Sequence, residues 1–141
     1  DGKKKMSKSE ESDFSRINLK DSPEEIIKKI KKAKTDSAPI PETKKELEEK
    51  PEALNLLNIY ADLTETNLDL ILNEMKGKEF SHLKNKLSEV LIEVVCPIGS
   101  QIKELMKNKD HLQKVLNKGT EKASIIAEDN LKKVRDIVGL L

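Results

Sequence analysis

The sequence contains few aromatic residues, and this scarcity restricts how its core can be built. Only Phe14, Tyr60 and Phe80 are aromatic, and tryptophan is absent from the 141 residues. A chain of this length has room for one ordinary domain, and 35% hydrophobic residues suffice to close a core. That core must consist mainly of leucine, isoleucine and valine, which favours helices.

Cysteine is equally scarce, and this limits which cellular compartment and which metal sites can be expected. Cys96 is the only cysteine, so no internal disulfide can form and a reducing compartment is expected. Histidine and cysteine do not cluster, and Asp62, Glu65 and Asp69 lack the spacing of a metal loop, so no protein-bound metal is expected.

No apolar run approaches the roughly 18 residues of a membrane span, and the start of the sequence lacks the apolar core of a secretory signal. We therefore expect a soluble, cytoplasmic protein without a membrane partner.

An excess of one charge sign is also missing. Lysine and arginine number 27 against 26 aspartates and glutamates, which leaves a net charge of +1. A field over the whole molecule that would hold it on nucleic acid is therefore excluded, and DNA is not an expected partner. Any contact with RNA must come from local basic patches.

A first helix is predicted to start at Ser22, where Pro23 suits the first helical position and Glu25 completes a capping box. Isoleucines 26, 27 and 30 share one face of this helix, and lysines 28, 29, 31 and 32 cover the rest. These lysines are either a solvated face or a stripe that faces phosphates. The stretch before the helix, 16–19, alternates polar and apolar residues and predicts a short extended segment.

Further helices are predicted beyond a long loop over 34–50, which contains two prolines and one short turn near Glu46. Segment 51–63 is apolar around nearly its whole circumference and predicts a buried helix. Thr66 and Asp69 form a capping box for a short helix that Gly77 ends.

Two long helices are predicted in the remainder. Apolar residues keep helical phase over 81–107 across Pro97, which indicates one kinked helix, with Gly99 easing the bend. They keep phase again beyond an Asp110 cap, which favours a single helix through Gly119 over a break there. The expected fold is an all-α bundle of four to five helices whose long apolar faces bury one another.

The residues that suggest chemistry lie in the opening stretch, DGKKKMSKSEES, which is too polar to fold by itself. Lys5 and Lys8 flank hydroxyl groups, so their ammonium groups can meet phosphate oxygens while Ser7 and Ser9 add hydrogen bonds. On composition alone, a solvated basic tail explains the stretch equally well. Other polar residues are expected to have structural roles. Cys96 should be a small buried hydrophobic residue, and Tyr60 either belongs to the core or contacts a further domain. No catalytic role is expected for His82 or His111.

The string KMSKS at 5–9 resembles the signature of class I aminoacyl-tRNA synthetases. The sequences SRINLKDSPEEIIKKIKKAKTDS and KPEALNLLNIYADL, with their Thr35-Asp36 step and Asn55-Leu56-Leu57 run, resemble the tryptophanyl branch of bacteria and organelles. The similarity continues in FSHLKNKLSEVLIEVVCPI, LNKGTEKASIIA and VRDIVGLL, and covers essentially the whole chain. One departure is Glu52, where many members have glycine after the proline.

This resemblance implies a division into a KMSKS loop over 1–15, left from a Rossmann-like catalytic domain, and a helical, anticodon-binding domain over 16–141. It implies that Lys8 and Lys5 are catalytic, that Lys5, Met6, Ser7, Lys8 and Ser9 bind the ATP phosphates, and that ATP enters with magnesium as a substrate. It also implies tRNA(Trp) as partner, tryptophan as substrate and a homodimeric parent enzyme.

No His-x-Gly-His motif or βαβ pattern accompanies the signature, so the chain alone is expected to be an inactive C-terminal portion of the ligase with a mobile start. The alternatives are a tyrosyl-type synthetase fragment and a free-standing helical interaction module.

Overall fold

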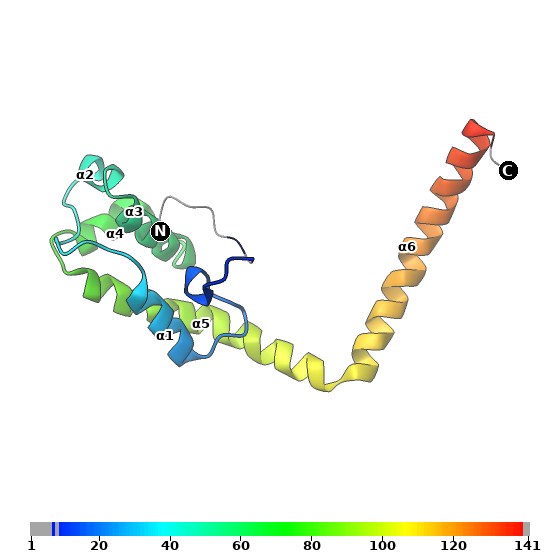
Figure 1. Ribbon diagram of the computed structural model, residues 1–141, viewed down its shortest axis with the longest axis horizontal. Helices are drawn as coiled ribbons and strands as arrows, with labels where there is room; N and C mark the ends of the chain where they lie inside the picture. The colour runs from blue at the N-terminus through cyan, green and yellow to red at the C-terminus, as the bar shows by residue number, and fades with distance from the viewer. Residues whose placement is uncertain (1–6, 8, 140–141) are drawn as a thin grey trace. The chain divides into compact units, whose positions relative to one another are not determined.

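The structure is a computed structural model, and it describes residues 7 and 9–139. Every regular element within them is a helix, as the sequence predicts (Figure 1). A 3₁₀ helix, η1 (Asp13–Ser15), precedes the six α-helices: α1 (Pro23–Lys32), α2 (Lys44–Glu48), α3 (Pro51–Leu63), α4 (Leu68–Met75), α5 (Phe80–Lys107) and α6 (Lys109–Val138). The chain divides into two compact units, unit 1 ending at Ser100 and unit 2 beginning at Gln101.

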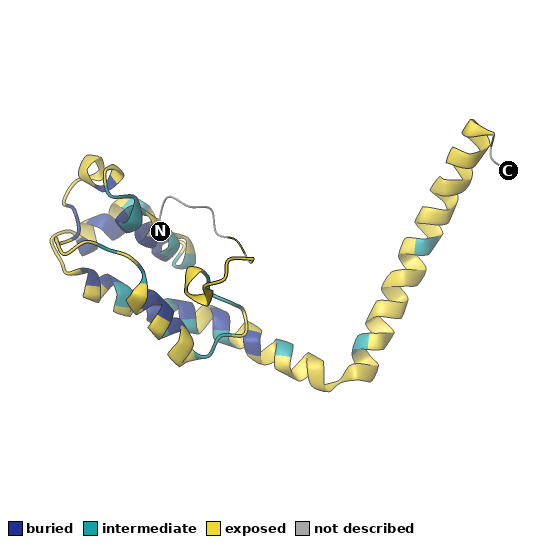
Figure 2. Ribbon diagram, viewed as in Figure 1, coloured by how far each residue is buried: buried dark blue, intermediate teal, exposed yellow. Residues whose placement is uncertain are grey.

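Unit 1 contains an aliphatic core to which α1 to α5 all contribute (Figure 2). The largest fully buried side chains are Ile26, Ile40, Leu47, Leu57, Met75, Leu83 and Leu87. Tyr60 and Phe80 are the only aromatic side chains buried among the described residues. Because long aliphatic side chains from successive helices fill the interior, the core has the composition that the scarcity of aromatic residues predicts.

The predicted start of α1 is confirmed at atomic detail. The Ser22 Oγ accepts a hydrogen bond from the Glu25 amide at 3.3 Å, and the Glu25 carboxylate accepts one from the Ser22 amide at 2.7 Å. This reciprocal pair satisfies two amide donors that the first helical turn leaves without partners.

Two other predicted caps are wrong. Helix α4 is capped by Asn67, whose side chain accepts from the Asp69 amide at 2.8 Å, while the Thr66 hydroxyl donates to the Thr64 carbonyl. Helix α6 is capped by Asn108, which accepts from the His111 amide at 3.0 Å, and not by Asp110. Asparagine is as good a cap as aspartate or threonine, so the actual start is decided by where the backbone turns.

The long loop after α1 is anchored more firmly than its prolines suggest. Ile40 is only 1% exposed, its amide donates to the Lys78 carbonyl at 2.9 Å, and its carbonyl accepts from the Gly77 amide at 2.9 Å. The predicted turn near Glu46 is the short helix α2, which buries Leu47. The loop therefore contributes two residues to the core of unit 1.

Helix α5 continues through Pro97 as one element, which confirms the prediction of a single helix. The structure gives Gly99 a role that sequence analysis did not predict. A Cβ atom at this position would lie 2.7 Å from the Leu19 carbonyl oxygen, far inside normal contact distance. The glycine thus allows the backbone between η1 and α1 to lie directly against α5.

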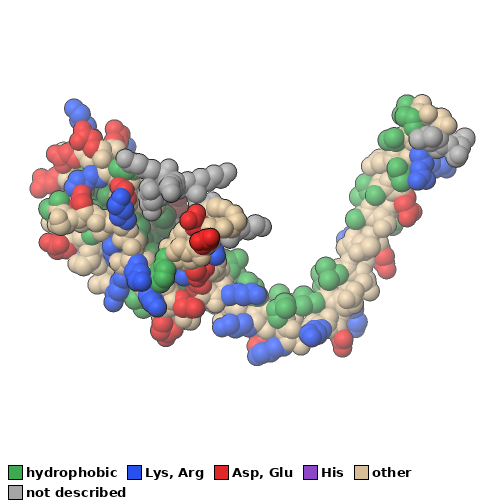
Figure 3. Space-filling view, in the orientation of Figure 1, with side chains coloured by type: hydrophobic (Ala, Val, Ile, Leu, Met, Phe, Trp, Pro, Cys, Tyr) green, Lys and Arg blue, Asp and Glu red, His purple; other side chains and the backbone are tan. Residues whose placement is uncertain are grey.

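Unit 2 contains the end of α5 and the whole of α6, which runs unbroken through Gly119 as predicted. The sequence predicts that every long helix buries its apolar face, but within unit 2 helix α6 buries no described residue. Figure 3 shows hydrophobic side chains on the surface of α6. The large apolar side chains exposed along this helix are Val115, Leu116, Ile125, Ile126, Leu131, Val134, Ile137 and Val138. A single long helix has no second layer within its own unit against which to bury them.

Candidate functional site

The signature residues proposed to bind phosphates lie partly outside the described residues. Lys5, Met6 and Lys8 fall there, so the structure does not place their side chains. Ser7 and Ser9 are described: their hydroxyl oxygens lie 2.8 Å apart, and the Ser9 amide donates to the Ser7 Oγ at 3.3 Å. The two residues are exposed, and their hydroxyls are bonded to each other.

The segment that follows the signature is attached to α1 by an ion-pair network. The ammonium group of Lys29 lies 2.6 Å from an oxygen of Asp13 and 2.6 Å from an oxygen of Asp21. The side chains of Lys29 and Asp21 are each only 7% exposed. One lysine of α1 thus joins an aspartate of η1 to an aspartate just before the helix.

Asn18 and Arg16 complete this network. The Asn18 side-chain amide donates to Asp13 at 2.9 Å and to Asp21 at 3.2 Å, and its backbone amide donates to Asp21 at 2.8 Å. Arg16 pairs with Asp13 at 3.2 Å and donates to the Glu10 carbonyl at 3.0 Å. These contacts tie the chain from Glu10 to Asp21 into one polar cluster.

The network shifts the pKa values of its members. A hydrogen bond from Lys29, aided by one from Asn18, lowers the pKa of Asp13. Burial would raise the pKa of Asp21, but hydrogen bonds from Lys29 and Asn18 outweigh it and lower the pKa. Burial likewise opposes the charge of Lys29, yet its bonds to Asp13 and Asp21 raise its pKa. All three groups are therefore held in their charged forms.

The predicted lysine stripe of α1 is divided by the structure. Lys29 belongs neither to a solvated face nor to a phosphate-facing stripe, because it is buried and paired with two carboxylates. Lys28 and Lys32 lie over the ring of Phe14, at 5.8 and 4.1 Å from its centroid. Lys31 is exposed, and Lys34 lies 3.6 Å from Glu52. A basic surface of Lys28, Lys31 and Lys32 remains.

Sequence analysis missed the network, although one signal was present. Lys29 lies between Ile26 and Ile30 on the face of α1 that carries its buried residues. A lysine on such a face requires a partner, since a buried ammonium group without one is strongly destabilising. Asp21, eight residues earlier, could have been proposed as that partner, but no pattern pointed to Asp13.

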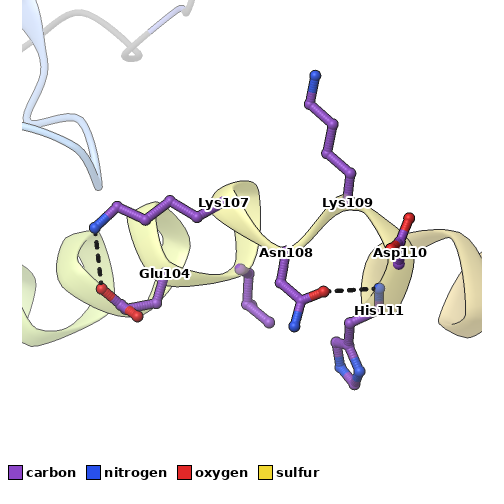
Figure 4. Close-up of a pocket in the computed structure, with 7 residues that line it drawn as sticks. Glu104, Lys107, Asn108, Lys109, Asp110 and His111 are labelled. Carbon is purple, nitrogen blue, oxygen red and sulfur yellow. Dashed lines mark hydrogen bonds and ion pairs between the residues drawn. The ribbon is translucent and has the colours of Figure 1, made fainter.

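The open pocket at the break between α5 and α6 lies entirely within unit 2. It is lined by residues 104, 105 and 107–111, and its side chains include Glu104, Lys107, Asp110 and His111 (Figure 4). Asn108 uses its side-chain oxygen to cap α6, and Lys107 pairs with Glu104 at 3.3 Å. Asn108 thus serves the start of α6, and no hydrogen bond or ion pair joins the His111 side chain to another residue that lines the pocket.

Several other candidates have structural roles. Tyr60 is 8% exposed and belongs to the core, and Cys96 packs against that core as a partly buried side chain. His82 is exposed.

No group of three or more metal-ligating side chains in the described part of the chain is arranged to hold an ion. None of the helices over 9–139 could serve as a membrane span, because each is too short or too polar.

Comparison with known proteins identifies the family. Curated relatives named tryptophan–tRNA ligase are 47% identical in Brucella melitensis, 45% in Mesorhizobium japonicum and 46% in Rickettsia felis, each over 141 residues. The matches cover 100% of this chain but only 40 to 42% of each relative, so the chain spans about two fifths of their length. The family model "tRNA synthetases class I (W and Y)" matches residues 1–95, and the chain therefore belongs to this family of tRNA synthetases.

Proposed function

We propose that this chain supplies the KMSKS loop and the helical domain of a tryptophan–tRNA ligase, which activates tryptophan with ATP and transfers it to tRNA(Trp). The observation that carries the proposal is 43 to 47% identity, along the whole chain, to curated relatives with that name. The family model covers tryptophan and tyrosine enzymes alike, so the relatives' names favour tryptophan over the tyrosyl alternative.

The proposed chemistry assigns the lysines of the signature to the phosphates of ATP. The carboxylate of tryptophan attacks the α-phosphate, and the bond from that phosphorus to the bridging oxygen breaks, which releases pyrophosphate. Negative charge moves onto the leaving group during this step. Lys8, supported by Lys5, stabilises that charge, Ser7 and Ser9 donate hydrogen bonds, and magnesium enters with ATP as part of the substrate.

The remaining assignments concern domains and partners. Residues 1–15 belong to the catalytic site, and residues 16–141 form the domain that contacts tRNA(Trp) through local basic surfaces. The exposed lysines 28, 31 and 32 of α1 are one such surface. The enzyme works as a homodimer in the cytoplasm, and light scattering on a chain of the relatives' full length measures the dimer directly.

Amino-acid-dependent exchange of pyrophosphate into ATP tests the proposed activity. An enzyme of the relatives' full length that contains this chain should catalyse exchange with tryptophan and not with tyrosine. Charging of a tRNA mixture with tryptophan should follow. Exchange that depends on tyrosine would favour the alternative, and exchange with neither amino acid would contradict both.

A further inference from the structure

We infer that Lys29 is a positioning residue for the KMSKS signature, because it holds the segment that leaves the signature on α1. Only the catalytic consequence of this inference rests on the proposed function; the anchoring itself rests on the geometry. We call residues 10–21 the exit segment, since the chain passes through them between Ser9 and the cap of α1 at Ser22.

The exit segment has little apolar burial of its own. No residue of η1 is buried, and Phe14 and Leu19 are 44% and 53% exposed. Ile17 alone among its large apolar side chains packs against the core, as a partly buried residue. A segment with so few apolar contacts depends on polar ones to keep a single position.

The polar contacts of Lys29 supply that position. Its ammonium group bonds at 2.6 Å to Asp13, near the start of the segment, and at 2.6 Å to Asp21, its last residue. Asn18 crosslinks the same two carboxylates from within the segment. Asp13 and Asp21 are thus both fixed to one buried ammonium group of α1, and Arg16 extends the attachment from Asp13 to the Glu10 carbonyl.

Stability alone does not account for a buried ammonium group at this place. Replacing a buried ion pair by apolar residues of similar volume is often neutral or stabilising, so a core need not contain one. What directed, charge-assisted bonds add is a defined geometry. That geometry sets where the backbone reaches Ser9 and hence where the signature lysines begin.

The first experiment measures the anchoring in the 141-residue chain, without reference to catalysis. Hydrogen exchange of the backbone amides in the exit segment is compared for wild type, Lys29→Met and a control, Lys84→Met. Lys84 is a suitable control because its ammonium group also bonds at α1, to the Ala33 carbonyl at 2.7 Å and the Lys31 carbonyl at 3.3 Å. None of its hydrogen bonds reaches the exit segment.

Lys29→Met should accelerate exchange at amides of the exit segment by about tenfold or more, the expected effect of losing bonds to charged partners. Amides of α3 and α4 should change no more than in Lys84→Met. Equal exchange in the exit segment of the two variants would overturn the anchoring.

The second experiment measures the consequence in an enzyme of the relatives' full length. Lys29→Met should lower kcat of tryptophan activation by about 10- to 100-fold, the typical cost of misplacing a reacting group, while the Kd of tryptophan stays within about twofold. Lys84→Met should leave kcat near wild type at a temperature where both variants are folded.

An unchanged kcat in Lys29→Met would overturn the positioning role. A wild-type enzyme without tryptophan-dependent exchange would instead contradict the proposed function, and the hydrogen-exchange comparison would still decide whether Lys29 holds the exit segment.

Discussion

At the residue scale, Lys29 and its aspartates make the stability of unit 1 depend on pH. Asp13 and Asp21 have folded-state pKa values below their ordinary 3.8, so their contribution is present above pH 3.8 and lost as the pH falls through the folded values. Lys29 has a folded-state pKa above 10.5, so its contribution is complete below pH 10.5 and lost as the pH rises through the folded value. Unit 1 should be most stable between these limits.

Asp21→Asn tests the acid side of this argument. At pH 7 the substitution should lower the free energy of unfolding by about 1.5 to 3 kcal/mol, the usual contribution of hydrogen bonds to a charged group. The difference from wild type should shrink as the pH falls from 3.8 through the folded-state pKa of Asp21. The wild-type carboxylate is then protonated and as uncharged as the asparagine that replaces it. Urea unfolding at several pH values measures both effects.

The matched control is Asp69→Asn, which breaks an ion pair between two exposed side chains, Asp69 and Lys44. It should change stability by less than about 0.5 kcal/mol. Equal losses in the two variants at pH 7 would show that the buried position of Asp21 is unimportant.

The same scale applies to the proposed catalytic lysine. In an enzyme of the relatives' full length, Lys8→Ala should raise the free-energy barrier of tryptophan activation by about 2 to 4 kcal/mol. The reason is that the negative charge which the lysine stabilises develops only during the reaction. The Kd of tryptophan should change much less. Pre-steady-state activation rates near wild type would contradict the assignment, and Lys45→Ala, at an exposed lysine of α2 outside the signature and the exit segment, is the control.

At the element scale, the two long helices contain glycines in opposite environments. Gly99→Ala should destabilise unit 1 by about 1 to 3 kcal/mol, since the new methyl group would lie 2.7 Å from the Leu19 carbonyl oxygen. Gly119→Ala should stabilise α6 by about 0.5 to 1 kcal/mol, because the added Cβ meets no atom within 4 Å beyond its chain neighbours and the adjoining backbone of its own helix, and alanine favours helices.

Amide hydrogen exchange, resolved for residues 80–100 and 109–138, distinguishes the two glycine substitutions, and circular dichroism of the whole chain measures its total helix content. Stabilisation by Gly99→Ala would mean that the Leu19 backbone does not lie against α5 in solution. A loss of helix content in Gly119→Ala would contradict the unbroken α6.

At the scale of the whole molecule, the net charge of +1 limits how tightly the chain can hold RNA. The exposed lysines of α1 should still give a modest, salt-sensitive affinity for tRNA. Lys31→Ala combined with Lys32→Ala should weaken binding and reduce the slope of log affinity against log salt by about 1 to 2, as expected for two lost phosphate contacts.

The control pair for the tRNA measurement is Lys44→Ala with Lys45→Ala, which removes the same charge from α2. Tight binding that does not weaken as the salt concentration rises would contradict binding through a few exposed lysines. Binding that both pairs weaken equally would assign RNA contact to general charge, and an absence of binding would place tRNA recognition elsewhere.

The sequence by itself determined the helical class, most helix bounds, the aliphatic core and the family. These follow from local information: in-phase apolar residues define α5 and α6, apolar residues around nearly the whole circumference define α3, and the Ser22–Glu25 pair sets the start of α1. The KMSKS string suggested its chemistry in the same way, because its residue types are contiguous. The roles of Lys5 and Lys8 and the division at residue 15 stay predictions.

Only the tertiary structure decided which polar residues meet across the chain. Asp13 and Lys29 are 16 positions apart, and the backbone of Leu19 contacts Gly99 from 80 positions away, so no local period could reveal either pair. The caps at Asn67 and Asn108 were likewise settled by the path of the backbone. Periodicity identifies a face that can be buried, whereas burial and ion pairing require a partner whose position depends on the whole fold.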